Sequence, residues 1–140
     1  MTSKRVLVDT GPLVAVFSRR DQFHDICMEQ MRRLSAPLLT CWPVITETAW
    51  LLKENPLAVQ RLLGEFGVGF LKLLSIEDEA MPWIIQFIRR YSDLGVQLAD
   101  ACLIYLAERE SIDTIFTLDR RDFSVFRIDG NLYFHLLPEL

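Results

Sequence analysis

Four acidic side chains, each in or beside an apolar segment of this 140-residue chain, carry the strongest indication of chemistry. These residues are Asp9, Glu47, Asp100 and Asp119. Carboxylates that are crowded together repel one another and take up protons unless a cation holds them. Mg²⁺ and Mn²⁺ prefer oxygen ligands of this kind, keep several waters and work with substrate phosphates. An ion held in this way can activate a water for attack on a phosphodiester.

The segment LADACLIYLAE, residues 98–108, places one of these acids in an unusual setting. It is typical of a helix that is apolar almost all the way round. From Asp100, helical spacing reaches Leu103, Ile104 and Ala107, so the carboxylate points along an apolar stripe. A buried ionised carboxylate costs several kcal/mol unless it is compensated. We expect the compensation to come from a metal ion and from the positive end of the helix.

The order of the elements predicts that the four acids meet. Two strands, residues 4–9 and 113–119, end in aspartate, and Glu47 and Asp100 fall in the first turns of predicted helices. In a parallel sheet, ligands bind at the carboxyl ends of the strands. Further strands are predicted over 36–42, 70–76 and 131–137, and helices over 11–18, 21–33, 43–53, 57–66, 77–93 and 98–110. This alternation predicts an α/β fold: three α/β/α layers with a mostly parallel central sheet of four to five strands.

Composition limits the classes of protein to which the chain can belong. Apolar residues make up 51% and charged residues 24% of the chain, which is typical of one globular domain, predicted over residues 1–140. No apolar run approaches the ~18 residues that a membrane span requires. Cys27, Cys41 and Cys102 are scattered and odd in number, which indicates reduced core thiols of a cytoplasmic protein. The net charge of −4 argues against nucleic acid, but arginine doublets and bound cations soften that argument.

Four blocks of sequence together resemble a known family. They are VLVDTGPLVAVF, TETAWLL, QLADACLIYLAE and IFTLDRRDF, and they span essentially the whole chain. In this order and spacing they resemble the PIN domain, and more narrowly the VapC-type toxin ribonucleases. The resemblance implies a Mg²⁺- or Mn²⁺-dependent endoribonuclease that hydrolyses RNA phosphodiester bonds. It also implies the toxin of a toxin–antitoxin pair, working as a homodimer held in check by a small antitoxin whose tail reaches the acidic groove.

The same resemblance assigns roles to individual residues. It makes the four acids the catalytic and metal-binding residues, and adds Asp122 as a ligand that acts directly or through water. Thr10 and Thr117 match hydroxyl positions that orient carboxylates or metal-bound water, as outer-shell groups do. One departure is Gln97, at a position where relatives often carry another acid. The tryptophans Trp42, Trp50 and Trp83 favour core or dimer contacts over base stacking.

Three other interpretations compete with this one. A haloacid dehalogenase-like phosphatase needs a second acid two residues after the first, where this chain has Gly11. A receiver domain needs an acidic pair after the first strand and a lysine late in the chain; here Thr10 follows Asp9, and no lysine follows Lys72. The stronger competitor is a catalytically silent PIN-like scaffold that binds RNA or protein. Its signature would be loss of the acids, all four of which are present.

Overall fold

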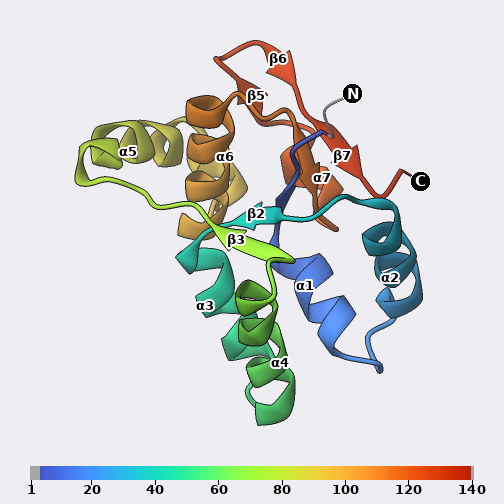
Figure 1. Cartoon of the computed structure of the whole chain (residues 1–140). Coiled ribbons are helices and arrows are strands. Elements are labelled where there is room, and N and C mark those ends of the chain that lie inside the picture. The colour runs from blue at the N-terminus through green and yellow to red at the C-terminus, as the bar shows by residue number, and fades with distance from the viewer. Residues whose placement is uncertain (1–3, 140) are drawn as a thin grey trace.

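A five-stranded, all-parallel sheet in the order β3-β2-β1-β4-β7 forms the centre of the computed structural model, which describes residues 4–139 (Figure 1). The pairings β1–β2, β2–β3, β1–β4 and β4–β7 are all parallel. The predicted α/β fold is therefore confirmed. The strands are β1 (Leu7–Val8), β2 (Leu38–Thr40), β3 (Leu71–Leu73), β4 (Thr114–Phe116) and β7 (His135–Leu137).

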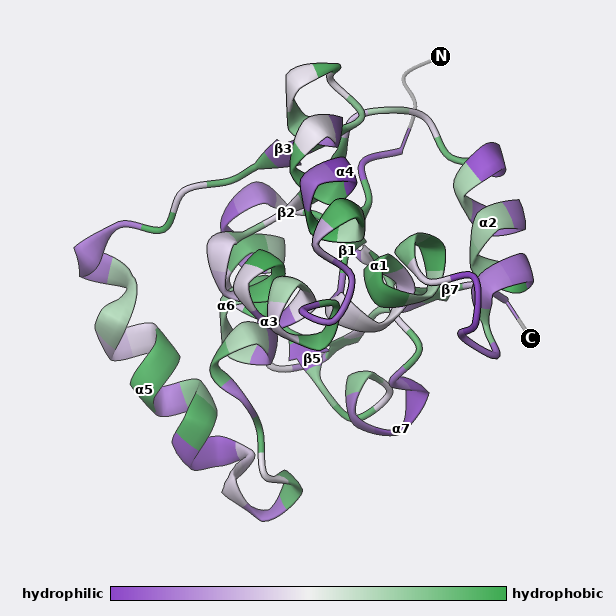
Figure 2. Cartoon of the chain, turned by 90° about the horizontal axis from the view of Figure 1, so that it is seen from below, coloured by the Kyte–Doolittle hydropathy of each residue, from purple (hydrophilic) through white to green (hydrophobic). Residues whose placement is uncertain are grey.

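Helices flank this sheet. In Figure 1, α1, α3 and α4 lie below the strands, whereas α5 and α6 lie beside and above them. Seen from below in Figure 2, the outer helices α2 and α5 carry hydrophilic segments, while the central α1 is mostly hydrophobic. Within residues 4–139, no helix has the length and apolar character needed to cross a membrane. The helices are α1 (Thr10–Phe17), α2 (His24–Arg33), α3 (Trp42–Leu51), α4 (Pro56–Gly67), α5 (Met81–Arg90), α6 (Leu98–Glu110) and α7 (Arg120–Phe123), with short 3₁₀ turns η1 (Asp78–Ala80) and η2 (Ser92–Leu94).

The core is built from central strands that are buried on both faces. Leu7 and Val8 of β1 and Ile115 and Phe116 of β4 are completely buried, as expected for parallel strands covered by helices. The apolar stripe predicted on α6 is also buried: Leu103, Ile104 and Ala107 have no exposed surface. The helix that carries Asp100 is thus fixed in the core.

The helices predicted over 21–33 and 77–93 differ most from the prediction. The first range places Asp21 at the start of the helix, but α2 begins at His24, and Asp21 Oδ1 instead accepts a hydrogen bond from Phe23 N at 2.8 Å. Asp21 therefore closes the turn before the helix. The predicted helix over 77–93 is divided into η1, α5 and η2, with a proline in the first turn of α5. Proline favours this position because its missing N–H would have no helical partner there.

The C-terminal segment is also more divided than predicted. In place of one strand over 131–137, β6 (Leu132–Tyr133) pairs antiparallel with β5 (Arg127–Ile128), and only β7 joins the main sheet. The turn between β5 and β6 contains Asp129 and Gly130, both with positive φ. Asp129 N donates a hydrogen bond to Glu108 Oε1 of α6 at 2.7 Å, which holds this hairpin against the domain.

Asn55 starts helix α4 and offers a local test of the fold. Its side chain accepts a hydrogen bond from Ala58 N at 3.2 Å, and Pro56 follows in the first turn. Asn55→Ala should lower the free energy of unfolding by about 1 kcal/mol, because one N-terminal N–H of the helix loses its partner. Urea unfolding monitored by circular dichroism measures this. Asn55→Asp, which keeps the acceptor, should stay within a few tenths of a kcal/mol of wild type.

Candidate active site

Asp9 lies at the point where the order of strands reverses. Strand β1 pairs with β2 on one side and with β4 on the other. The strands that follow β1 in sequence are first added on the β2 side and then on the β4 side, so the strand order changes direction at β1. Such a switch opens a crevice at the carboxyl ends of the strands. Asp9 follows β1 directly, precedes the first residue of α1, and is only 7% exposed. A carboxylate is therefore buried at the edge where this class of fold binds its ligands.

Thr117 connects Asp9 to the neighbouring strand end. Its buried hydroxyl donates a hydrogen bond to Asp9 Oδ2 at 2.8 Å and accepts one from Asp119 N at 3.0 Å. The first bond orients the carboxylate of Asp9, and the second fixes the turn that carries Asp119. One side chain thus holds together residues that are 110 positions apart in the chain.

Asp100 comes to this edge on helix α6. It is the third residue of that helix and is partly buried. Its Oδ2 accepts a hydrogen bond from Gln97 N at 3.3 Å, so the helix start compensates part of its charge. Gln97, at the position where the family often has an acid, is the residue immediately before α6.

Glu47 projects from helix α3. The prediction placed it in the first turn, but α3 begins at Trp42, so Glu47 lies in the second turn, and the prediction is wrong in this detail. Its charge nevertheless acts on the same cluster, because it helps to raise the pKa of Asp9 and that of Asp100. Glu47 is partly exposed and forms the outer side of the group.

Asp119 and Asp122 belong to the short helix α7. Asp119 caps this helix, with Oδ1 accepting a hydrogen bond from Asp122 N at 3.1 Å. Asp122 Oδ1 is buried and has no hydrogen-bond partner, although Arg121 Nε lies 3.7 Å away. Burial and the neighbouring charge of Asp119 raise the pKa of Asp122, and Arg121 opposes them.

The protonation behaviour of the cluster shows that its charges interact. Burial raises the pKa of Asp9 to about 7, and the charges of Asp100 and Glu47 add to the effect. Burial likewise raises the pKa of Asp100 to about 6, with contributions from Asp119, Glu47 and Asp122. These acids from four separate segments therefore share one electrostatic environment. In the absence of a cation, that environment disfavours the ionised forms of Asp9, Asp100 and Asp122.

The donor set suits a hard divalent cation. All its atoms are oxygens, and two of them, Asp122 Oδ1 and Thr10 Oγ1, are buried without a hydrogen-bond partner. Buried polar atoms are normally satisfied, so each of these lacks a partner that an ion or its water would supply. As the side chains stand, no three His, Cys, Asp or Glu residues within 4–139 form a group that would hold a metal.

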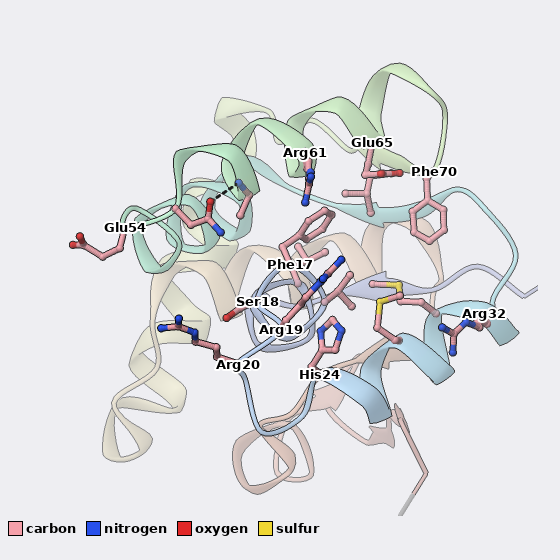
Figure 3. Close-up of a pocket in the computed structure, with 17 residues that line it drawn as sticks. Phe17, Ser18, Arg19, Arg20, His24, Arg32, Glu54, Arg61, Glu65 and Phe70 are labelled. Atoms are coloured by element: carbon pink, nitrogen blue, oxygen red, sulfur yellow. Dashed lines mark hydrogen bonds between the residues drawn. The ribbon is translucent and has the colours of Figure 1, made fainter.

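A large cavity lies apart from the acidic cluster, between α1, α2 and α4 (Figure 3). Its volume is about 960 Å³, and its apolar wall includes Leu13, Phe17, Met31 and Phe70. Charged side chains surround it: the arginines Arg19, Arg20, Arg32 and Arg61, and the glutamates Glu54 and Glu65. The five acids described above do not line it. His24 does, and its Nδ1 lies 2.7 Å from Ala15 O. This cavity is therefore a separate surface feature.

The sequence analysis gave the three tryptophans core or dimer contacts. Trp83 stacks on Phe87 with ring centroids 5.3 Å apart, whereas Trp42 and Trp50 are 61% and 65% exposed and are not core residues, so a dimer contact stays a prediction for these two. The sequence analysis gave no role to Lys53, whose Nζ lies 4.1 Å from the centroid of the Trp50 ring. Helical spacing could have indicated that Trp50 lies on the same face of its helix as Glu47, because Trp50 follows Glu47 by three residues.

Known proteins resemble this chain over nearly its whole length. The PIN domain family model matches residues 6–128. Ribonuclease VapC26 of Mycobacterium tuberculosis (strain ATCC 25618 / H37Rv) is 28% identical over 138 residues, covering 95% of this chain and 100% of that protein. The crystal structure of M. tuberculosis VapC20, described as a sarcin-ricin loop cleaving toxin, has a TM-score of 0.71 at 13% identity. That match covers 83% of this chain and 91% of the other. At such low identity the structural likeness shows the fold.

Proposed function

The chain belongs to the PIN domain family, and from this premise we propose that it is a divalent-metal-dependent endoribonuclease. The sequence similarity to a ribonuclease supports the reaction class. We also propose that residues 1–140 act as a single nuclease domain in the cytoplasm, and that the protein is the toxin of a toxin–antitoxin pair.

The observation that carries this proposal is the shared electrostatic environment of the acids. The pKa of Asp9 responds to Asp100 and Glu47, and that of Asp100 responds to Asp119, Glu47 and Asp122. Acids gathered from four segments at one sheet edge destabilise the metal-free protein, so a structural role alone does not explain them. A cation-dependent function does.

We propose that Asp9, Glu47, Asp100, Asp119 and Asp122 hold Mg²⁺ or Mn²⁺. When bound, such an ion activates a water and offsets charge on the scissile phosphate. The chain contributes orientation: Thr117 positions Asp9, Gln97 N positions Asp100, and Asp122 N positions Asp119. The free hydroxyl of Thr10, next to Asp9, is available to position water at the same place.

The direct test combines metal binding with RNA cleavage. Purified protein is incubated with structured RNAs in Mg²⁺, Mn²⁺ or EDTA, and metal binding is measured by calorimetry. Cleavage by wild type should require the metal, and Asp100→Asn should remove both cleavage and most of the binding. Asp113→Asn is a matched control, because Asp113 precedes the opposite end of β4 from Asp119. It should behave as wild type.

The competing function is a PIN-like scaffold that binds RNA or a protein without cutting it. Its expected result is different: no cleavage of any RNA by wild type, together with no heat of metal binding. That pair of results would replace the nuclease proposal with the scaffold.

Thr117 provides a test of orientation within the site. Thr117→Val should lower the cleavage rate by about 10–100-fold, because Asp9 loses the hydroxyl that positions it. Rates with Mn²⁺ at saturating RNA measure the effect. Thr117→Ser, which keeps the hydroxyl, should recover most of the activity. Thr114→Val removes a buried hydroxyl from the far end of the same strand, where it bonds Asp113, and should leave the rate close to wild type.

We further propose that the protein forms a homodimer and that an antitoxin covers the cavity of Figure 3. This cavity combines an apolar wall with four arginines against two glutamates, so its excess positive charge complements an acidic amphipathic segment. The test first asks whether a small protein is encoded beside this chain's gene, and then coexpresses that protein with this chain. Arg61→Glu, in the cavity, should weaken the complex at least tenfold by calorimetry, whereas Arg33→Glu, outside it, should not. Light scattering measures whether the protein is a dimer. Equal affinities of Arg61→Glu and Arg33→Glu for the small protein would count against this surface.

A further inference from the structure

An exposed indole accompanies the acidic cluster on helix α3. Trp50 follows Glu47 by three residues, so the two side chains share one face of the helix. Trp50 as a residue is 65% exposed, which is unusual for one with so large an apolar side chain. A flat apolar surface therefore lies one helical turn from a residue of the candidate active site.

A cation lies directly over this ring. Lys53 Nζ is 4.1 Å from the centroid of Trp50, within the range of a cation–π interaction. Among residues 4–139, Lys53 forms no salt bridge with a carboxylate. Its ammonium group therefore remains available to an anion from outside the chain. The pair combines an aromatic face with a positive charge, which are the two elements that bind a nucleotide within a single strand.

We propose that Trp50 and Lys53 form a subsite for one nucleotide of single-stranded RNA beside the acidic cluster. The proposal rests on the proposed ribonuclease function and names how its substrate is held. The base stacks on the part of the indole that Lys53 leaves exposed, and the ammonium group pairs with the adjoining phosphate. The acidic cluster repels phosphates by itself, so a cation one turn away helps to keep the strand at the site.

The charge of Lys53 favours RNA over an apolar protein surface. Packing an apolar surface on Trp50 would remove the ammonium group from water without giving it a partner, which is costly. A phosphate supplies that partner. Lys53, Glu54 and Asn55 are all exposed and bring polar groups to this side of Trp50, next to the exposed Leu51.

The test uses binding without cleavage. In the Asp100→Asn background, fluorescence anisotropy measures the affinity for a labelled eight-nucleotide uridine oligomer. Adding Trp50→Ala should weaken binding about tenfold, while Trp50→Phe should keep most of the affinity. Lys53→Gln should weaken binding a few-fold and reduce its dependence on salt. In the wild-type background, Trp50→Ala should raise KM more than it lowers kcat.

Trp42→Ala is the matched control. Trp42 is equally exposed on the same helix, but it lies about 140° round the helix axis from Glu47. This variant should bind the oligomer as its parent does. Equal loss of affinity in Trp42→Ala and Trp50→Ala would overturn the subsite, because any exposed indole would then serve.

The remaining outcomes separate this inference from its alternatives. If Trp50→Ala converts a dimer to a monomer in light scattering and the monomer binds the oligomer as tightly as before, Trp50 is a contact between copies, and the subsite is wrong. If wild type cleaves RNA and Trp50→Ala changes neither KM nor oligomer affinity, the subsite fails while the nuclease proposal stands. If wild type does not cleave but binding still depends on Trp50, the nuclease proposal fails and the subsite stands.

Discussion

Asp9→Asn should reduce RNA cleavage by about 1000-fold or more and at the same time stabilise the metal-free protein. The loss of activity should exceed the 10–100-fold cost of removing an outer-shell group, because Asp9 is proposed to hold the ion itself. The gain in stability follows from burial, which raises the pKa of Asp9 to about 7. At pH 8 the wild-type protein must ionise a buried carboxyl, whereas asparagine stays neutral and can still accept the hydrogen bond from Thr117.

The stability change can be bounded from the pKa. A shift from 3.8 to about 7 corresponds to roughly 2–4 kcal/mol of unfolding free energy at pH 8, after allowance for relaxation around the charge. Urea unfolding in EDTA measures it, alongside cleavage assays in Mn²⁺. Asp113→Asn, at the opposite end of β4, should neither stabilise the protein nor lower its activity. Destabilisation by Asp9→Asn at pH 8, or full activity of that variant, would contradict the assignment.

The second large effect is a dependence of stability on pH that metal reverses. Asp9 and Asp100 have a raised pKa in the folded protein, to about 7 and about 6. A raised carboxyl pKa means that the folded state holds its proton more tightly than the unfolded state. This contribution to stability is complete below about pH 4 and is lost as the pH rises to about 7. Metal-free protein should therefore become less stable over this interval, by up to about 1.4 kcal/mol per pH unit for each proton released.

Saturating Mn²⁺ should reverse this trend, because the ion binds the ionised carboxylates of the folded state. Unfolding free energies from pH 4.5 to 8, in EDTA and in Mn²⁺, should therefore form two lines of opposite slope. In Asp9→Asn the EDTA line should flatten. Glu77 and Asp113, whose pKa values are lowered, act in the opposite sense only at lower pH. Parallel lines in EDTA and Mn²⁺ would mean that these carboxylates do not hold the ion.

Helix α6 is an element whose first and last residues could both be predicted from sequence. Its predicted range, 98–110, is the observed one, because the apolar pattern is continuous and Ser111 ends it with a left-handed backbone. The meeting of the acids also follows from chain order, since strands that end in Asp9 and Asp119 become neighbours in the sheet. These features depend on patterns within one element or on general rules of topology.

The features that escaped prediction depend on contacts between distant residues. The β5–β6 hairpin is held by Glu108, which accepts hydrogen bonds from Asp129 N and from Trp83 Nε1, 21 and 25 positions away. The family resemblance assigned Thr117 an orienting role, but its bond to Asp9 depends on the register of β1 against β4. Local sequence contains no record of such partners. The start of α2 was misplaced for a simpler reason: an aspartate can close a turn as readily as it caps a helix.

The central position of β1 has a consequence for synthesis on the ribosome. Leu7 pairs with Leu39 early in the chain, but its other neighbour, Ile115, is added more than one hundred residues later. During translation the edge of β1 that pairs with β4 therefore has no partner strand until the β4 segment has left the exit tunnel. Asp9 follows that strand directly, and Asp119 and Asp122 emerge later still. A nascent chain that ends before residue 119 lacks two of the five acids, Asp119 and Asp122, so the proposed metal site cannot be complete at that stage.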